Sequence, residues 1–144
     1  MFLGNTLDIA IKDKMLQAGE LGVCNFKNNS NIKNQLKKWL FAQAEICLND
    51  FLDEISKQIG MNYKQCKVIS ARKKWGSCNN NAEIRLNYKL IMLKQEYIYY
   101  VCIHELCHIK HLNHSKQFWA LVAKYCPNYK KIRNDMKQFS FCLE

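Results

Sequence analysis

Apolar residues recur every three or four positions from Ile32 to Ile59, and this spacing predicts one long amphipathic helix. Gly60 follows directly, as is common at the end of a helix. A stripe of this kind is typical of core packing, so we expect the helix to bury one face. The stripe consists of Ile32, Leu36, Trp39, Leu40, Cys47, Phe51, Ile55 and Ile59.

Shorter apolar segments before this helix predict β-strands. Leu7, Ile9 and Ile11 alternate with polar or small residues, which is the period of a half-buried strand. A partner strand is expected within residues 21–26, after a turn near Gly19. The chain therefore begins with β-rich material.

Two further strands are predicted after the long helix, at Cys66–Ser70 and Ala82–Tyr88. Between them lie the tetrapeptide Trp-Gly-Ser-Cys at positions 75–78 and three turn-forming asparagines at 79–81. We expect Gly76 to supply a positive φ angle at a bulge.

Three more helices are predicted toward the end of the chain, at Gln95–Leu112, Ser115–Cys126 and about Tyr129–Phe139. Pro127 ends the second of them, because proline cannot continue a helix. The sequence contains no internal repeat, low-complexity tract or dividing linker. Mixed strands and helices in this order predict a single α+β fold.

Composition narrows the class of protein. A chain of 144 residues with 49% hydrophobic residues, five glycines and one proline is long enough for one buried core, and it is not a disordered chain. No apolar run reaches the length of a membrane span, and charged residues interrupt the first fifteen positions where a leader would be apolar. The eight cysteines form no CxxC pair, which favours reduced, buried thiols over a disulfide framework. We therefore expect a cytoplasmic protein with no membrane partner.

The chain is strongly basic, because its 22 basic residues outnumber its 12 acidic residues and the net charge is +10. Residues 55–82 and 106–134 each carry six basic residues and no carboxylate. Such stretches attract polyanions, including nucleic acid. They also fit a merely solvated surface, since 19 of the basic residues are lysine rather than the arginine preferred for bidentate phosphate contacts.

The candidate chemistry lies in one short segment, because all four histidines fall between positions 104 and 114. The local string His-Glu-Leu-Cys-His at 104–108 is an HExxH pattern. On a helix, His104 and His108 share one face and can reach one metal ion. Glu105 is then placed beside a water on that ion rather than on the ion itself. The spacing predicts a zinc site.

Two residues compete to be the third ligand. His111 would stay on the same helical face, whereas His114 can ligate only if the helix ends and the chain turns back. Asn113 can adopt the left-handed backbone conformation at low energetic cost, and Ser115 is a suitable N-cap for the next helix. The sequence is therefore compatible with that turn. Tetrahedral zinc disfavours three ligands in one straight row. We therefore favour His114 and expect His111 to lie beside the site.

This ligand set predicts one catalytic zinc per chain, with water in the fourth position. Glu105 is expected to act as the base that takes a proton from that water and returns it to the leaving amine. A further donor should stabilise the oxyanion. The candidates, which stay open at this point, are Arg85, Asn87, Tyr88 and His111; Arg85, Asn87 and His111 are also candidates for substrate binding.

From about Leu36 onward the chain resembles the YgjP-like metallopeptidase family, relatives of the SprT-like and WLM zincins. The matching motifs are Trp-Gly-Ser-Cys at 75–78, Ile-Arg-Leu-Asn at 84–87, the HExxH string, Asn-His-Ser at 113–115 and Phe-Trp at 118–119. The resemblance implies a zincin-like core with a small sheet or hairpin on an active-site helix and flanking helices. It also implies that His104, His108 and His114 bind zinc and that Glu105 is the catalytic base.

The resemblance carries two further expectations. Family members have a longer N-terminal β-rich region, so we expect residues 1–30 to be a remnant of it and residues 31–144 to form the metallopeptidase domain. Zincins hold an extended substrate along an edge strand above the metal helix, and Glu83–Tyr88 is the expected edge.

The leading hypothesis is a zinc-dependent hydrolase that cleaves peptide bonds in a peptide or protein substrate. The alternative is a basic module associated with nucleic acid, in which zinc is structural. The two combine in a protease that acts on DNA-bound proteins, as the SprT-like and WLM relatives do. The remaining hypothesis is a family member that binds the metal but does not catalyse hydrolysis.

Overall fold

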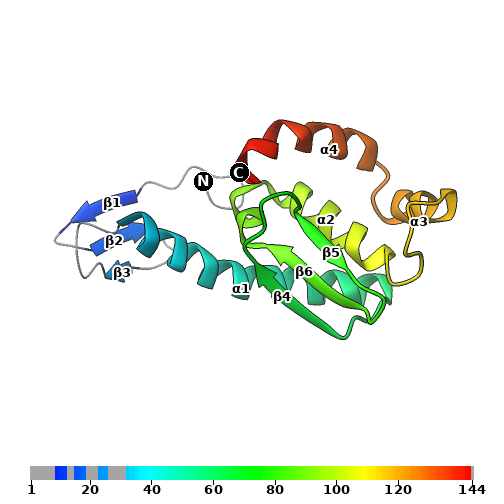
Figure 1. Ribbon diagram of the computed structural model, residues 1–144, viewed down its shortest axis with the longest axis horizontal. Helices are drawn as coiled ribbons and strands as arrows, with labels where there is room; N and C mark the ends of the chain where they lie inside the picture. The colour runs from blue at the N-terminus through cyan, green and yellow to red at the C-terminus, as the bar shows by residue number, and fades with distance from the viewer. Residues whose placement is uncertain (1–8, 13–14, 19–22, 26–31, 144) are drawn as a thin grey trace.

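The computed structural model describes residues 9–12, 15–18, 23–25 and 32–143, with side chains described from 33 to 140. The first three segments are β1 (Ile9–Lys12), β2 (Met15–Ala18) and β3 (Val23–Asn25), which pair antiparallel in that order. The predicted strand around Ile9 is confirmed, and β2 is an additional strand. Leu7, Leu21 and Phe26 lie outside the described residues. Figure 1 shows this small sheet near the start of the first helix.

The long helix α1 spans Ile32–Ile59, as predicted, and Gly60 ends it with a φ of 65°. Its most deeply buried side chains are Ala44, Leu48 and Leu52, each with 0% exposure. These three residues follow the predicted three-to-four spacing but were not part of the predicted stripe. These three side chains belong to the hydrophobic core, so α1 packs against the rest of the domain through this face.

A second sheet consists of β4 (Gln65–Ile69), β5 (Gly76–Cys78) and β6 (Glu83–Asn87), in the spatial order β4-β6-β5. The central strand β6 pairs parallel with β4 and antiparallel with β5. The expectation that Glu83–Tyr88 forms the edge is therefore wrong. The residues around Gly76, expected as a bulge, form a strand and occupy one side of β6.

The turn between β5 and β6 uses the side chain of Asn79, whose Oδ1 accepts hydrogen bonds from the amides of Asn81 and Glu83. Ala82, with φ of 55°, is the one non-glycine residue of the described part with a positive φ. Neither Gly76 nor Asn113 adopts the left-handed conformation that the sequence suggested.

The helices of the C-terminal half follow a short 3-10 helix, η3 (Tyr88–Met92). They are α2 (Gln95–Cys107), α3 (Lys116–Tyr125) and α4 (Tyr129–Asp135), and a final 3-10 helix, η4 (Met136–Leu143), follows α4. The three helices are present as predicted, but α2 ends five residues earlier than expected, at Cys107 rather than Leu112. The last helix is α-helical only to Asp135, and its expected continuation to Phe139 is a 3-10 helix. The Ser115 hydroxyl caps α3 by accepting from the Phe118 amide at 3.3 Å, as predicted.

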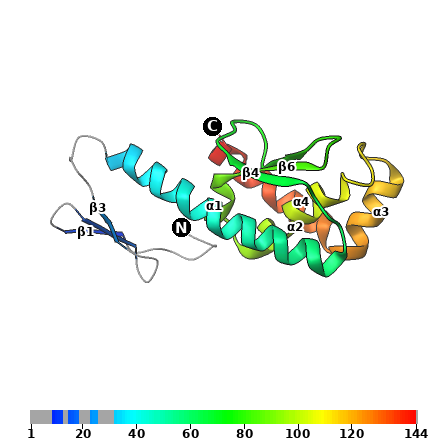
Figure 2. The ribbon, with the colours of Figure 1, turned by 90° about the horizontal axis from the view of Figure 1, so that it is seen from below.

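The elements form two layers, with the β4–β6 sheet on one side and helices α1 and α2 on the other (Figure 2). Helix α2 lies inside this arrangement, and nine of its residues are buried. Its central position explains why its sequence is apolar nearly all round. The metal motif is thus placed on the most enclosed helix of the domain.

Replacing Leu52 with alanine is expected to destabilise the domain by about 2–5 kcal/mol, because it leaves a cavity in a fully packed core. Ile46 lies on the same helix with 61% exposure and provides the matched control, since Ile46→Ala should change stability by less than about 0.5 kcal/mol. Urea unfolding followed by circular dichroism measures both. Equal losses in the two variants would contradict the described burial of α1.

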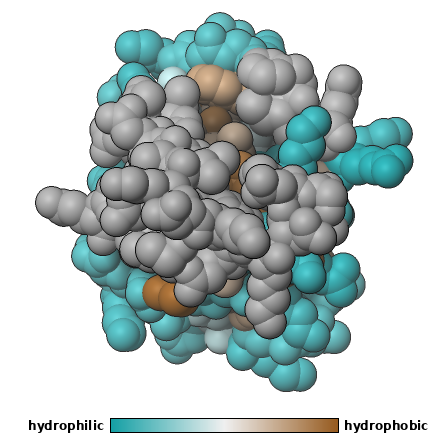
Figure 3. Space-filling model, turned by 90° about the vertical axis from the view of Figure 1, so that its left-hand side faces the viewer, coloured by the Kyte–Doolittle hydropathy of each residue, from teal (hydrophilic) through white to brown (hydrophobic). Residues whose placement is uncertain are grey.

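The described surface is mostly hydrophilic on the side shown in Figure 3. Ile46 and Leu112 are the large hydrophobic residues that are exposed among the residues with described side chains. No helix in the described segments has the length and apolar character needed to cross a membrane.

Candidate metal centre

Three of the four histidines converge at the end of α2. His104 and His108 lie one helical turn apart, and His114 comes from the loop that leads into α3. One nitrogen from each ring lies within 4.8 Å of the other two. The Nε2 atoms of His104 and His114 are 3.0 Å apart. The structure therefore brings together the three residues that the sequence singled out.

The return of the chain depends on the early end of α2. The amide of His111 donates to the carbonyl of Cys107 at 3.1 Å, which closes the last turn before the loop. The carbonyl of His111 in turn lies 3.0 Å from Nδ1 of His108. If Nδ1 carries the proton in this bond, Nε2 of His108 keeps its lone pair for a metal. His111 thus lies beside the site, as expected, and it acts through its backbone.

Aromatic side chains enclose the histidine rings. Phe118 stacks on His108 with ring centroids 4.4 Å apart, and Trp119 stacks on His114 at 5.5 Å. His104 meets the edge of Tyr100 at 5.8 Å. The Nδ1 atom of His104 is buried and has no hydrogen-bond partner in the described part of the chain.

Burial keeps the two helical histidines neutral. It lowers the pKa of His104 to about 3, with smaller contributions from the neighbouring His108 and His114 and from Arg133. Burial also lowers the pKa of His108, although the contact with the His111 carbonyl opposes this shift. A neutral imidazole is the form that binds a metal ion. The electrostatics therefore favour ligation at neutral pH.

Glu105 lies beside the histidines and is only 5% exposed. Burial raises the pKa of its carboxyl to about 8, and Lys74 offsets part of the rise. A carboxyl that titrates near neutral pH is suited to accept and return a proton.

The backbone of Gly76 makes room for Glu105. A Cβ atom placed on this glycine would lie 2.7 Å from Oε1 of Glu105 and 2.8 Å from its Cγ. Real Cβ contacts essentially never come that close. The sequence suggested a glycine with positive φ, but the structure requires glycine here for close approach between β5 and α2.

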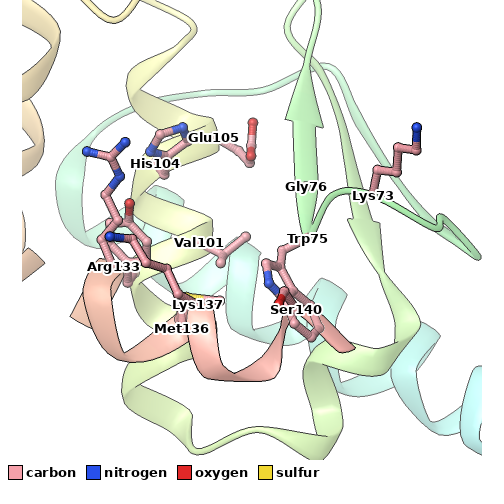
Figure 4. Close-up of a pocket in the computed structure, with 11 residues that line it drawn as sticks. Lys73, Trp75, Gly76, Val101, His104, Glu105, Arg133, Met136, Lys137 and Ser140 are labelled. Carbon is pink, nitrogen blue, oxygen red and sulfur yellow. The ribbon is translucent and has the colours of Figure 1, made fainter. Parts of the chain in front are cut away.

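His104 and Glu105 line one cavity of about 370 Å³ (Figure 4). Strand β5 with its preceding loop, helix α2, and the consecutive helices α4 and η4 contribute its walls. The lining consists of Lys73, Trp75, Gly76, Tyr100, Val101, His104, Glu105, Arg133, Met136, Lys137 and Ser140. The candidate centre therefore opens directly into a space that can receive part of a substrate.

The other predicted site residues lie elsewhere. Arg85 is exposed on the central strand and does not line this cavity. The side-chain amide of Asn87 donates to the backbone carbonyls of Ala71 and Lys74, and its Oδ1 accepts from the backbone amide of Lys89. The Asn87 side chain therefore holds the loop before β5 in place. Tyr88 is buried against Phe41. The structure supports a loop-bracing role for Asn87 and gives no contact of Arg85 with the centre.

The structure adds residues that the sequence reasoning missed. Tyr100, Arg133 and Lys137 line the cavity, although only the basic character of the last helix was visible in the sequence. Burial raises the pKa of Tyr100 to about 12, so its hydroxyl keeps its proton. Spacing along α2 could have indicated Tyr100, which lies one turn before His104, whereas nothing in the sequence indicated how the last helix packs.

The cysteine expectation holds for the thiols whose surroundings are described. Cys47, Cys66, Cys78, Cys102, Cys107 and Cys126 are all free. Burial raises the pKa of Cys107 to about 12, which keeps this thiol protonated beside the histidines. These thiols are packing groups.

The histidine group fits a bound metal ion. Three imidazole nitrogens converge, two of them are neutral through burial, and one ring is oriented by a carbonyl. Three imidazoles with space for a fourth ligand are typical of catalytic zinc sites, whereas structural zinc sites have four protein ligands. The donor set thus matches a catalytic metal centre.

Comparison with solved structures shows the same fold in two metallopeptidase zymogens. Abylysin of Pyrococcus abyssi is 24% identical, with a TM-score of 0.56 over 63% of this chain and 93% of that chain. Jannalysin of Methanocaldococcus jannaschii is 23% identical, with a TM-score of 0.55 over 63% of this chain and 94% of that chain. These neighbours confirm the predicted α+β, zincin-like architecture.

A search of curated protein sequences found no match. The family profile described as "YgjP-like, metallopeptidase domain" matches residues 2–139. This match supports a metal-dependent peptidase that acts on peptide or protein substrates, and it gives no support to a nucleic-acid partner. The chain belongs to the YgjP-like metallopeptidase family.

Proposed function

We propose that this protein is a zinc-dependent peptidase in which His104, His108 and His114 hold one zinc ion per chain. The observation that supports this most is the convergence of the three imidazoles within 4.8 Å, beside a buried carboxylate that lines the same cavity. The convergence favours His114 over His111 as the third ligand. All of these residues belong to the segment 31–144, which we propose as the catalytic unit.

Each group has a separate task in peptide cleavage. A zinc ion at this site would supply Lewis-acid chemistry, which makes water more acidic and polarises a carbonyl group. Glu105 accepts a proton from the attacking water and passes it to the nitrogen of the leaving amine. The packing of Glu105 against Gly76 fixes the carboxyl at the cavity wall, where both transfers take place.

The sheet offers one strand for an extended substrate. Since β6 is paired on both sides, the outer strands of this sheet are β4 and β5. Only β5 borders the cavity, because Gly76 contributes to its wall. We therefore propose that a substrate backbone pairs with the outer side of β5.

Metal binding tests the ligand set directly. Replacing His114 with alanine is expected to lower zinc affinity by more than the roughly tenfold to hundredfold that loss of a ligand's hydrogen-bond partner costs, since it removes one of three donors. His111→Ala is the matched control, and it should retain affinity because His111 contributes its backbone carbonyl. Competition with a chromophoric chelator measures both affinities, and metal analysis gives the zinc content per chain. Loss of zinc in His111→Ala together with retention in His114→Ala would reverse the assignment.

A further inference from the structure

Three basic residues line the cavity beside the candidate centre. Lys73, Arg133 and Lys137 line it, and its one carboxylate is the buried Glu105. Among the residues with described side chains, no carboxylate forms an ion pair with these three cations. Lys137 donates to the neutral Asn134 side chain at 3.2 Å, and Arg133 lies over the Trp119 ring at 4.9 Å. No carboxylate among the described side chains therefore neutralises the charges of Arg133 and Lys137.

Two of these cations and a tyrosine line the cavity together. Figure 4 shows Arg133 and Lys137 reaching from α4 and η4 toward the side of the cavity where His104 lies. Tyr100 lines the same cavity as Arg133 and Lys137. The guanidinium and the ammonium present only hydrogen-bond donors, and the phenol can donate one further hydrogen bond. This is the environment that binds an anionic oxygen group.

Apolar side chains also line the cavity. They are Trp75, Val101 and Met136, and Met136 is only 5% exposed. A cavity lined by both apolar and cationic side chains suits a group that has a short hydrocarbon stem and an anionic tip. A volume of about 370 Å³ is in the range of single-ligand pockets and accommodates a peptide side chain.

We propose that this cavity is a specificity pocket for a carboxylate next to the scissile bond, so that the enzyme prefers substrates with an acidic residue there. This inference rests on the proposed peptidase function and adds the substrate class to it. The carboxylate can belong to a Glu or Asp side chain or to the end of a peptide chain. Both share the same chemistry, and peptides with free or amidated ends distinguish them.

The test begins with the zinc-loaded full chain and an unbiased mixture of peptides, in which mass spectrometry identifies the residues that flank each cleaved bond. We expect enrichment of Glu and Asp at one flanking position. Cleaved sequences are then resynthesised with Glu replaced by Gln at that position, in amidated and free-acid forms. The Glu peptide is expected to have a kcat/KM about tenfold higher than the Gln peptide, as a charge-assisted hydrogen bond would give.

Charge reversal at Lys137 provides the sharper readout. Lys137 is exposed, and it donates a hydrogen bond to the neutral side chain of Asn134, so Lys137→Glu should fold normally. We expect this variant to lose the preference for Glu over Gln and to favour a Lys-substituted peptide. Lys131→Glu makes the same charge change on exposed α4 surface outside the cavity, and it should retain the wild-type preference. The ratio of kcat/KM for the Glu peptide to kcat/KM for the Gln peptide does not change when part of the enzyme is inactive.

The outcomes separate the two proposals. If the zinc-loaded wild type cleaves no peptide, the proposed peptidase function fails. If it cleaves peptides with no acidic preference, or if Lys131→Glu and Lys137→Glu change the preference equally, the specificity pocket is refuted. Adding a single-stranded oligonucleotide to the peptide assay tests whether the cations bind nucleic acid instead of a substrate carboxylate. Competitive inhibition that Lys137→Glu abolishes, without any effect of that variant on peptide preference, would assign the cations to nucleic acid instead.

Discussion

Glu105→Gln is expected to lower kcat/KM for peptide cleavage by roughly a hundredfold to ten-thousandfold, the range that general acid–base groups contribute. The amide preserves the size of the side chain but cannot accept a proton from water. The side chain is buried beside Gly76 and is not one of the three converging imidazoles, so its replacement should leave the zinc content unchanged. Steady-state kinetics and metal analysis on the same preparation measure the two properties.

Glu96→Gln is the matched control for this result. Glu96 lies in the first turn of the same helix and is exposed, so the same chemical change there should leave both properties at wild-type values. Full activity in Glu105→Gln would rule out Glu105 as the base. Loss of zinc in that variant would show instead that the carboxylate is needed to build the site.

Gly76→Ala is expected to lower kcat/KM by about a hundredfold, the cost of misplacing a reacting group by about 1 Å. The added methyl group would lie 2.7 Å from Oε1 of Glu105, and the flexible carboxyl is the part that can move. The three atoms nearest to this methyl position all belong to Glu105 and none to a histidine, so zinc affinity should be retained. Most of the loss should appear in kcat, because the acid–base group is displaced while the cavity remains.

Gly60→Ala provides the opposite pattern. Gly60 has a φ of 65° and no atom within 4 Å of its added Cβ, so the substitution strains the backbone without touching the centre. It should cost about 1–2 kcal/mol in stability and leave kcat/KM unchanged. Thermal unfolding together with kinetics on both variants distinguishes the two roles of glycine. A Gly76→Ala enzyme with wild-type kcat would contradict the close packing of Glu105.

These predictions connect the charge of the chain to its proposed chemistry. The sequence left open whether +10 reflects a polyanionic partner or a solvated surface. Packing of the last helices places two of the basic residues, Arg133 and Lys137, at the cavity that His104 and Glu105 share. Two cations that line the cavity beside the candidate centre are a more specific feature than the net charge.

Much of the secondary structure followed from the sequence, because periodicity reports which face of an element is buried. The helix Ile32–Ile59 was predicted with its observed bounds, since its apolar stripe is long and a glycine ends it. The three-residue strand at Gly76–Cys78 was missed because so short a segment has no measurable alternation. That omission also produced the wrong edge strand, since a strand inserted at one side of β6 makes β6 central.

The sequence by itself determined the candidate ligands. HExxH spacing puts two imidazoles on one helical face, and the Ser115 cap allows a third to return after the helix ends. Only the tertiary structure decided what surrounds them. Gly76 gives room to Glu105, the His111 carbonyl orients His108, and Arg133 reaches the cavity from a separate helix. These contacts join residues distant in sequence or depend on backbone atoms, and neither periodicity nor residue type records them.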